Sequence, residues 1–434
     1  MSAARSSGAS PGFLRRLPGH VASGGPGYLQ SAMTLGGGTA VSSVFAGRMF
    51  GYDLLWVAPC GMLFGVLMLG VLARLALTAD ERPYAAMARA AGRAVALAWA
   101  IGTVVASVIW HFPQYALAGG ALSDAAALGG SALPPWLGAA ATLLLALAMS
   151  FLYGPRPGLV RAYEWIVRAL IAGVVVCFAL VVAETSGSTD WGAVLAGFVP
   201  SIPEPRGGIQ PTTLIAGGLS SAVGINMVFL YPYSLRARGW GAWDVERARV
   251  DLVFGMLLPF TLATTLVVVA TANTIPWAAG ADTGATKLTP LEAAEAFGGI
   301  LGNRAGRLVF DLGLFGMALS TIALHMVACG YAVAEIAGAP LHGRAYRLGT
   351  LLPIPGVLGP VLWSELVWIA VPTSVVCGLF LPLAYFGIVR WAGRSAATAG
   401  PTREGRLTRA ALLALTLAFS GVMLSDLAPK IFPG

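Results

Sequence analysis

Long apolar runs alternate with short polar segments along most of this chain. A helix that crosses a bilayer needs about 20 apolar residues, and eleven runs approach or exceed that length. We expect them at 26–50, 52–78, 93–121, 134–153, 160–183, 211–237, 248–272, 307–335, 347–362, 365–390 and 407–428. The ninth is short and contains Pro353 and Pro355. The pattern therefore predicts an all-α polytopic membrane protein, with eleven transmembrane helices in a lipid bilayer.

Composition supports a membrane protein over a soluble or disordered one. Hydrophobic residues make up 57% of the 434 residues and charged residues 11%, whereas about 25% are charged in an ordinary soluble domain. A soluble domain of this length could not hide so much apolar surface, and disordered chains are polar. The net charge of +8 fits the arginines that membrane proteins collect in cytoplasmic loops. No basic stripe is interleaved with aromatics, so nucleic-acid binding is not indicated.

Several kinds of chemistry have no motif in this sequence. It contains no HExxH, P-loop or GxGxxG pattern, so we expect no enzyme, no cofactor and no ATP-driven transport by this chain alone. The four cysteines lie in apolar runs without a CxxC pair, which indicates neither disulfides nor a cysteine metal site. Transport driven by a gradient remains, and no pattern indicates an oligomeric state.

The basic residues predict the topology. With the N-terminus in the cytoplasm, 21 of the 27 Lys and Arg residues fall on the cytoplasmic side, as is usual for membrane proteins. We therefore expect an extracytoplasmic C-terminus and a bacterial inner membrane. The expected segments are a cytoplasmic tail over 1–24, five helices over 25–183, an extracytoplasmic loop over 184–210, five helices over 211–390, and a cytoplasmic loop with an eleventh helix over 391–434.

The first and sixth expected helices contain glycines at their centres. Glycines 36–38 lie in the first, and Gly217, Gly218 and Gly224 lie in the sixth. Each costs a helix about 1 kcal/mol relative to alanine. Broken helices at matching positions in two halves are typical of a transporter substrate site, because free backbone groups at that depth must line a cavity. The alternative is that these glycines form packing faces for neighbouring helices.

Residues 25–57 carry a specific resemblance. They read GPGYLQSAMTLGGGTAVSSVFAGRMFGYDLLWV, which resembles the first helix of the Nramp family of divalent-metal transporters. That family's pattern opens with Gly-Pro and ends with Ala-Gly, Gly-Tyr and Leu-Leu-Trp-Val. A second stretch, 215–238, resembles the family's sixth helix, with Tyr231 and Ser234 in its Tyr-Leu-His-Ser tail. The resemblance implies a LeuT-type fold of two inverted five-helix repeats plus one extra helix, and secondary active transport of a metal ion.

This sequence departs from the family at its functional positions. The family's first-helix Asp-Pro-Gly-Asn falls on Gly36, Gly37, Gly38 and Thr39, and its Met-Pro-His on Asn226, Met227 and Val228. A second family histidine falls on Tyr233, and a glutamine of the tenth helix on Phe380. A family Asp and Glu that serve proton movement fall on His111 and Gln114. Almost every metal-binding or proton-relaying side chain of the family is therefore replaced.

We expect the substrate to bind at the two breaks. The candidate binding residues are Leu35, Gly36, Gly37, Gly38, Thr39, Val223, Gly224, Asn226, Met227, Tyr233 and Phe380. Thr39 and Asn226 are the candidate metal donors, and His111 and Gln114 are the candidates for proton coupling. His325, in the eighth run, is either functional or a structural histidine. A site without carboxylates favours a more hydrated divalent cation, such as Mg²⁺, over a dehydrated transition metal.

Two alternatives remain. Half-helix N-termini carry partial positive charge, and we expect such half-helices to begin at Thr39 and Val228. A small organic or anionic solute would suit them, walled by the aromatics Trp110, Tyr231, Tyr233 and Phe380. The other alternative is a membrane sensor that has lost its transport site.

Overall fold

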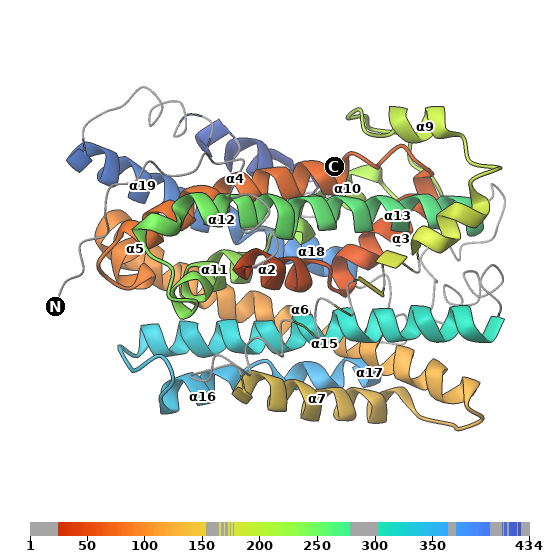
Figure 1. Cartoon of the computed structure of the whole chain (residues 1–434), viewed down its shortest axis with the longest axis horizontal. Coiled ribbons are helices and arrows are strands. Elements are labelled where there is room, and N and C mark those ends of the chain that lie inside the picture. Colours follow the sequence, from red (N-terminus) through yellow and green to blue (C-terminus); the bar gives the residue numbers. More distant parts are fainter. Residues whose placement is uncertain are drawn as a thin grey trace, which may run out of the picture.

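The protein is a bundle of helices that run roughly along one axis (Figure 1). We describe a computed structural model over residues 25–152, 178–277, 303–362 and 370–399, with parts of 165–177 and 410–426. The expected N-terminal tail, 1–24, and residues 400–406 of the expected 391–406 loop lie outside the described residues. The described helices include α4 (Val57–Thr78), α5 (Pro83–Ala91), α6 (Arg93–Leu128), α7 (Pro135–Leu152) and α15 (Asn303–Ile336).

Six helices in the described part are long and apolar enough to cross a membrane. They cover Val57–Thr78, Arg93–Leu128, Pro211–Ala237, Ala242–Thr274, Arg304–Ile336 and Thr373–Ser395, and two shorter apolar helices cover Pro135–Phe151 and Leu412–Asp426. Each overlaps one of the expected spans, with ends that differ by up to about eight residues. The chain is therefore an all-helical, multi-span membrane protein.

The first and sixth helices are both broken. The first consists of α2 (Pro26–Thr34) and α3 (Gly37–Phe50), joined by Leu35 and Gly36. The sixth consists of α10 (Pro211–Ala222) and α11 (Ile225–Ala237), joined by Val223 and Gly224. The breaks lie at Gly36 and Gly224, two of the expected glycines, whereas Gly217 and Gly218 lie within α10. The two breaks contact each other, because the Thr34 hydroxyl donates to the Ala222 carbonyl at 3.1 Å.

The half-helices begin earlier than expected. We expected starts at Thr39 and Val228, but α3 begins at Gly37 and α11 at Ile225. Gly36 and Gly224 are the extended residues before each helix, with ψ of 178° and 161°. Two residues therefore suffice for each break. Gly37 and Gly38 are helical despite their low propensity, because tertiary packing overrides it.

The ninth and tenth runs are less regular than expected. The ninth, 347–362, is not one helix but α16 (Arg344–Leu351), a 3₁₀ segment (Ile354–Leu358) and α17 (Gly359–Leu362). Pro353 and Pro355 explain this division, because proline cannot donate within a helix. The tenth consists of α18 (Ala370–Gly378) and α19 (Leu381–Ala399). Since α19 passes residue 390, the expected loop at 391–406 begins with nine helical residues.

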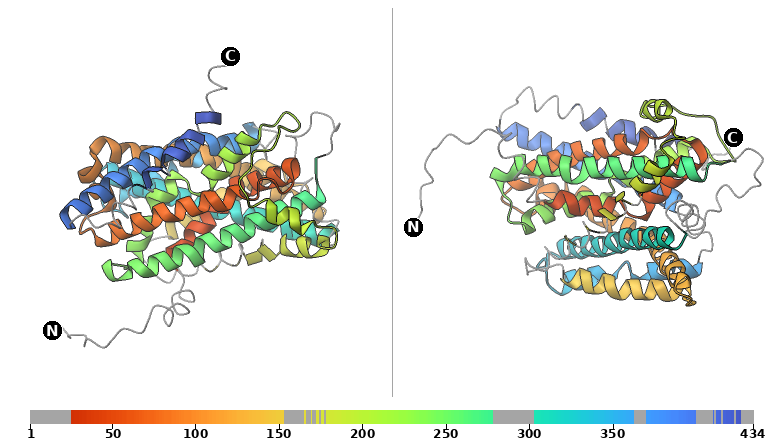
Figure 2. Two further views of the ribbon diagram at one scale, coloured as in Figure 1. Left: turned by 90° about the horizontal axis from the view of Figure 1, so that it is seen from above. Right: turned by 45° about the vertical axis from the view of Figure 1, so that its right-hand side comes forward.

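The expected 184–210 loop contains one short helix, α9 (Trp191–Ala196), and an isolated bridge between Arg206 and Ile209. The Asp190 side chain caps α9 by accepting from the Ala193 N–H at 3.0 Å. Aspartate is favoured at that position because it satisfies an N–H that the helix leaves free. This segment folds over one end of the bundle, where α3 ends (Figure 2).

A carboxylate just before a π-helical turn of the seventh helix holds the first half-helix in place. The seventh helix consists of a short 3₁₀ turn (Ala242–Asp244), α12 (Val245–Leu252), the π turn Val253–Leu257 and α13 (Leu258–Thr274). Asp251, just before the π turn, accepts from the Gly27 N–H at 2.6 Å. Gly27 lies in the first turn of α2, where a carboxylate also interacts favourably with the helix dipole. Asp251 therefore anchors α2 to α12.

We expect Asp251→Ala to lower the thermal unfolding midpoint of the purified protein, because a hydrogen bond to a charged group contributes about 1.5–3 kcal/mol. Asp251→Asn keeps an acceptor oxygen and should lose less. Asp53→Ala is the control, since Asp53 pairs with Arg206 at 3.5 Å but is 47% exposed, and exposed pairs contribute little. Equal shifts in Asp251→Ala and Asp53→Ala would contradict the anchoring role.

Candidate functional site

A small cavity lies where the two broken helices meet. Its lining comes from α2, α3, α6, α10, α11 and α15. The fourteen lining residues are Met33, Thr34, Gly36, Gly38, Thr39, Trp110, Gln114, Ser220, Ser221, Gly224, Asn226, Met227, Thr321 and His325. The cavity volume is about 20 Å³. One water needs about 10–15 Å³ by this measure, so this conformation has room for a small ion or one to two waters.

The structure brings most of the expected site residues together. Gly36, Gly38, Thr39, Gly224, Asn226, Met227 and Gln114 all line the cavity. Leu35 and Val223 are buried in the two joints, where they lie outside the helices. Gly37 contributes its N–H, which donates to the Gln114 side-chain oxygen at 3.1 Å. Gln114, which we expected to serve proton coupling, therefore caps α3.

Tyr233 and Phe380 are not among the lining residues. The Tyr233 hydroxyl donates to Glu335 at 3.0 Å, and its ring stacks on Phe229 and Tyr331 at centroid distances of 5.3 and 5.1 Å. Phe380 lies between α18 and α19 and packs beside Gly102 of α6. Both side chains therefore belong to packing contacts outside this cavity.

His111 lies behind the cavity. Its Nδ1 is 2.5 Å from the Ser107 carbonyl on the same helix, and its side chain is fully buried. Its ring is 5.5 Å from the ring of His325, which does line the cavity. The two imidazoles form a buried pair across the α6–α15 interface, and His325 is the member that a substrate can meet.

Most polar side chains near the breaks form hydrogen bonds with backbone groups or with the Met227 sulfur. Thr39 donates to the Ser221 carbonyl at 3.4 Å, and Thr321 donates to the Met33 carbonyl at 3.3 Å. The Met227 sulfur accepts from the Thr34 hydroxyl at 3.0 Å and from the Gly224 N–H at 3.4 Å. Helix ends leave such backbone groups without intrahelical partners, so these side chains stabilise the breaks.

Two polar atoms at the cavity have no hydrogen-bond partner in the described structure. They are the Asn226 side-chain nitrogen and His325 Nδ1. An amide nitrogen only donates, whereas a neutral imidazole nitrogen can offer a lone pair. No lining residue is a carboxylate, a lysine or an arginine. The site is therefore neutral when His325 is neutral, and His325 is its best unoccupied donor for a metal ion.

Sequence reasoning left His325 open and did not single out Thr321, Ser220, Ser221 or Thr34. Thr321 and His325 are four residues apart, so they lie one above the other on the same face of α15. The sequence signal that could have identified them is two polar residues four apart within an apolar run. Which helix the pair faces depends on packing between segments almost 290 residues apart.

The three consecutive glycines allow close packing. A Cβ atom at Gly36 would collide with Thr321, at Gly37 with Leu117, and at Gly38 with the Trp110 ring. These contacts join α3 to α6 and the first joint to α15. The glycines therefore serve both purposes considered from the sequence, because they permit the break and form a packing face.

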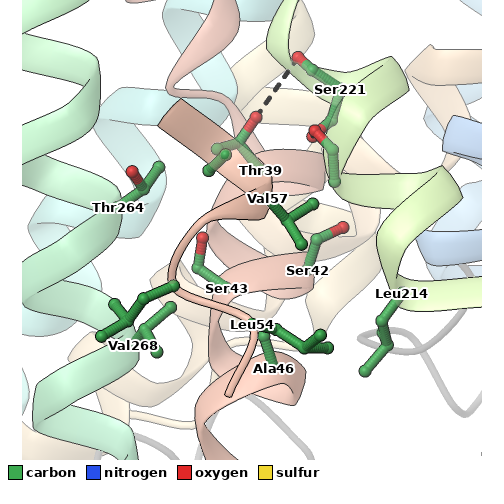
Figure 3. Close-up of a pocket in the computed structure, with 13 residues that line it drawn as sticks. Thr39, Ser42, Ser43, Ala46, Leu54, Val57, Leu214, Ser221, Thr264 and Val268 are labelled. Carbon is green, nitrogen blue, oxygen red and sulfur yellow. Dashed lines mark hydrogen bonds between the residues drawn. The ribbon is translucent and has the colours of Figure 1, made fainter. Parts of the chain in front are cut away.

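A second cavity lies beside the first and shares Thr39 and Ser221 with it (Figure 3). Hydroxyls of Ser42, Ser43 and Thr264 also line it, together with aliphatic side chains such as Leu54, Val57 and Leu214. Its volume is also about 20 Å³. The bond from Thr39 to the Ser221 carbonyl joins the two residues that line both cavities.

Comparisons with known proteins give one consistent result. The family model described as natural resistance-associated macrophage protein-like (Nramp) matches residues 27–427. The chain is 27% identical over 386 residues to a protein named divalent metal cation transporter MntH from Agrobacterium fabrum, covering 84% of this chain and 78% of that one.

Solved structures show the same fold. A manganese transporter of Eremococcus coleocola, in complex with an aromatic bis-isothiourea compound, matches with a TM-score of 0.69 and 19% identity, over 97% of this chain and 89% of that one. Mhp1, a nucleobase-cation-symport-1 family transporter, matches with a TM-score of 0.59 and 14% identity, over 94% and 92%. At these identities the likeness concerns the fold alone.

We expect Gly38→Ala to lower the thermal unfolding midpoint, because its methyl group would occupy the space of the Trp110 ring, and overpacking costs about 1–3 kcal/mol. Gly187→Ala is the matched control, since a Cβ there meets nothing within 4 Å. Adding Trp110→Phe to Gly38→Ala should recover part of the loss, because neighbouring substitutions couple. An unchanged midpoint in Gly38→Ala would rule out tight packing at this position.

Proposed function

The chain belongs to the Nramp family, and on that premise we propose that it carries a divalent metal cation across the membrane by alternating access at its two broken helices. The family is one of transporters, not of enzymes. The observation that carries the proposal is the cavity to which both joints contribute, with Gly36 and Thr39 on one side and Gly224 and Asn226 on the other. The names of its relatives, a divalent metal cation transporter and a manganese transporter, point to the same substrate class.

The donors at the cavity favour a cation that keeps part of its water. Hard cations bind oxygen, and Mg²⁺ usually retains several waters. The cavity offers hydroxyls, two side-chain amides and carbonyl groups, but no carboxylate, so a fully dehydrated divalent ion would be poorly compensated. Mg²⁺ or another hydrated divalent ion therefore suits Thr39 and Asn226, while the imidazole of His325 adds a donor that transition metals prefer.

The size of the cavity speaks against an organic solute. Pockets for such ligands measure about 300–1,000 Å³, against about 20 Å³ here. Of the four aromatics considered as walls for an organic solute, only Trp110 lines the cavity. A cation is therefore preferred over a small organic or anionic substrate.

The wider arrangement follows from the same proposal. We propose two inverted five-helix repeats over about 25–183 and 211–390, followed by an eleventh helix. The excess of arginines supports a cytoplasmic N-terminus in a bacterial inner membrane. We also propose that transport is coupled to protons.

Uptake into proteoliposomes of the purified protein tests this function. We expect saturable uptake of Mn²⁺ or Mg²⁺ that increases when an inward pH gradient is imposed, because a coupled proton would add its own driving force. Protein-free liposomes are the control. If folded protein takes up neither ion with or without the gradient, divalent-cation transport is wrong, and carboxylates and amino acids should be screened next.

His325→Ala should weaken Mn²⁺ binding about tenfold, or about 1.4 kcal/mol, and weaken Mg²⁺ binding less, because imidazole prefers transition metals. Titration calorimetry with each ion measures both affinities. His342→Ala is the matched control: His342 lies between α15 and α16, where it packs against Tyr331 and Tyr346 and burial lowers its pKa. Equal Mn²⁺ affinities in both variants and the parent protein would exclude His325 as a donor.

A further inference from the structure

A second group of buried ionisable residues lies at one end of the α6–α15 pair, away from the cavity. It consists of Asp124 on α6 and of Arg307 and Asp311 on α15. Asp311 is ten residues from Thr321, or about 15 Å along the helix. The group therefore lies near the end of the bundle where α6 ends and α15 begins, and it takes no part in the cavity described above.

Arg307 joins the two helices through Asp124. Its Nη2 donates to one Asp124 oxygen, and its Nε donates to the other at 3.4 Å. The Arg307 side chain is 20% exposed, whereas that of Asp124 is 6% exposed. The guanidinium and this carboxylate thus form a two-point ion pair that still touches the surface.

Asp311 has no comparable partner. It is 1% exposed, and neither of its oxygens has a hydrogen-bond partner of good geometry in the described structure. The charged groups that it faces are the Asp124 carboxyl and the Arg307 guanidinium. Two buried carboxyl groups therefore share one arginine, which already bonds Asp124 at both oxygens.

The surrounding elements supply no second cation among the described residues. Arg304, one turn earlier on α15, donates to the Leu128 carbonyl at 2.6 Å. The helix α7, which packs against both α6 and α15, carries no titratable side chain. With both carboxyls ionised, the group would hold a net charge of −1 in a buried position, which is costly.

We propose that Asp124 and Asp311 together hold one proton, which exchanges with water at the Arg307 end and is the proton that moves with the metal. This rests on the proposed function. The step is simple proton binding: a hydronium ion gives its proton to an Asp311 oxygen and leaves as water, and the group becomes neutral. Two carboxyls in one site cannot both ionise readily, so a single shared proton is the stable state.

Loss of the proton would change the metal site, because α6 and α15 carry residues of both sites. The helix α6 carries Trp110 and Gln114 to the cavity, and α15 carries Thr321 and His325. When the proton leaves, the ionised Asp311 faces the Asp124 carboxylate, and the repulsion acts between these same two helices. The packing of α6 against α15 therefore differs between the protonated and the deprotonated group. Coupling requires such an element with two states, whose balance the proton shifts.

Asp311→Asn tests the proposal in proteoliposomes, with metal uptake and internal acidification followed together. We expect the variant to move metal down its own gradient, while the proton influx and the pH dependence of uptake shown by the parent protein are lost. Asp53→Asn, which changes an exposed carboxylate, should behave like the parent. Asp311→Glu restores a carboxyl group and should restore proton influx. Unchanged proton influx in Asp311→Asn would overturn the proposal.

Infrared spectroscopy of the purified protein gives a second test that does not require transport. A protonated carboxylic acid has a carbonyl stretching band that a carboxylate and an amide lack. We expect this band in the parent protein at neutral pH, its disappearance in Asp311→Asn, and its retention in Asp311→Glu and Asp53→Asn. A band unaffected by Asp311→Asn would overturn the proton site. If the parent protein moves no metal while the band behaves as expected, the proton site stands and the proposed transport function fails.

Discussion

A helix that is broken within a membrane leaves backbone groups that must find partners inside the protein, and much of this structure meets that requirement. At the first break the Gly37 N–H is held by Gln114, and the Met33 carbonyl by Thr321. At the second, the Ala222 carbonyl is held by Thr34 and the Ser221 carbonyl by Thr39. Each partner comes from another helix. The two breaks are therefore stable only because α2, α3, α6, α10 and α15 meet there.

This requirement shapes the substrate site. Hydroxyl and sulfur groups that would serve a metal ion already bond to the backbone, and the cavity contains no carboxylate to replace them. A cation that enters either keeps some of its water or takes the place of these internal hydrogen bonds. Replacing these hydrogen bonds would weaken the two joints while the cation fills the site. Cation binding and helix movement are linked in this way, as alternating access through broken helices requires.

Close packing is the second constraint. The glycines at 36–38 leave no room for side chains against Thr321, Leu117 and Trp110, so α3 can approach α6. Helices α6 and α15 also contact each other at two separate places. One holds the His111–His325 pair, and the other holds the Asp124–Arg307–Asp311 group. No carboxylate lines the cavity at the breaks. Two buried acids lie on α15 outside it, Asp311 near the start of the helix and Glu335 near its end.

The sequence by itself determined the membrane class, most helix positions and the two breaks, because hydrophobic runs and glycine clusters act locally. It could not determine which side chains meet at the breaks. Tyr233 lies seven residues beyond Asn226, about 10 Å along α11, and packs with Glu335 instead. Phe380 matched the family's position but packs beside Gly102. His325 and Thr321 reach the cavity only because α15 packs beside the first break. Side-chain direction and contacts between distant segments depend on helix packing, and only the tertiary structure decided them.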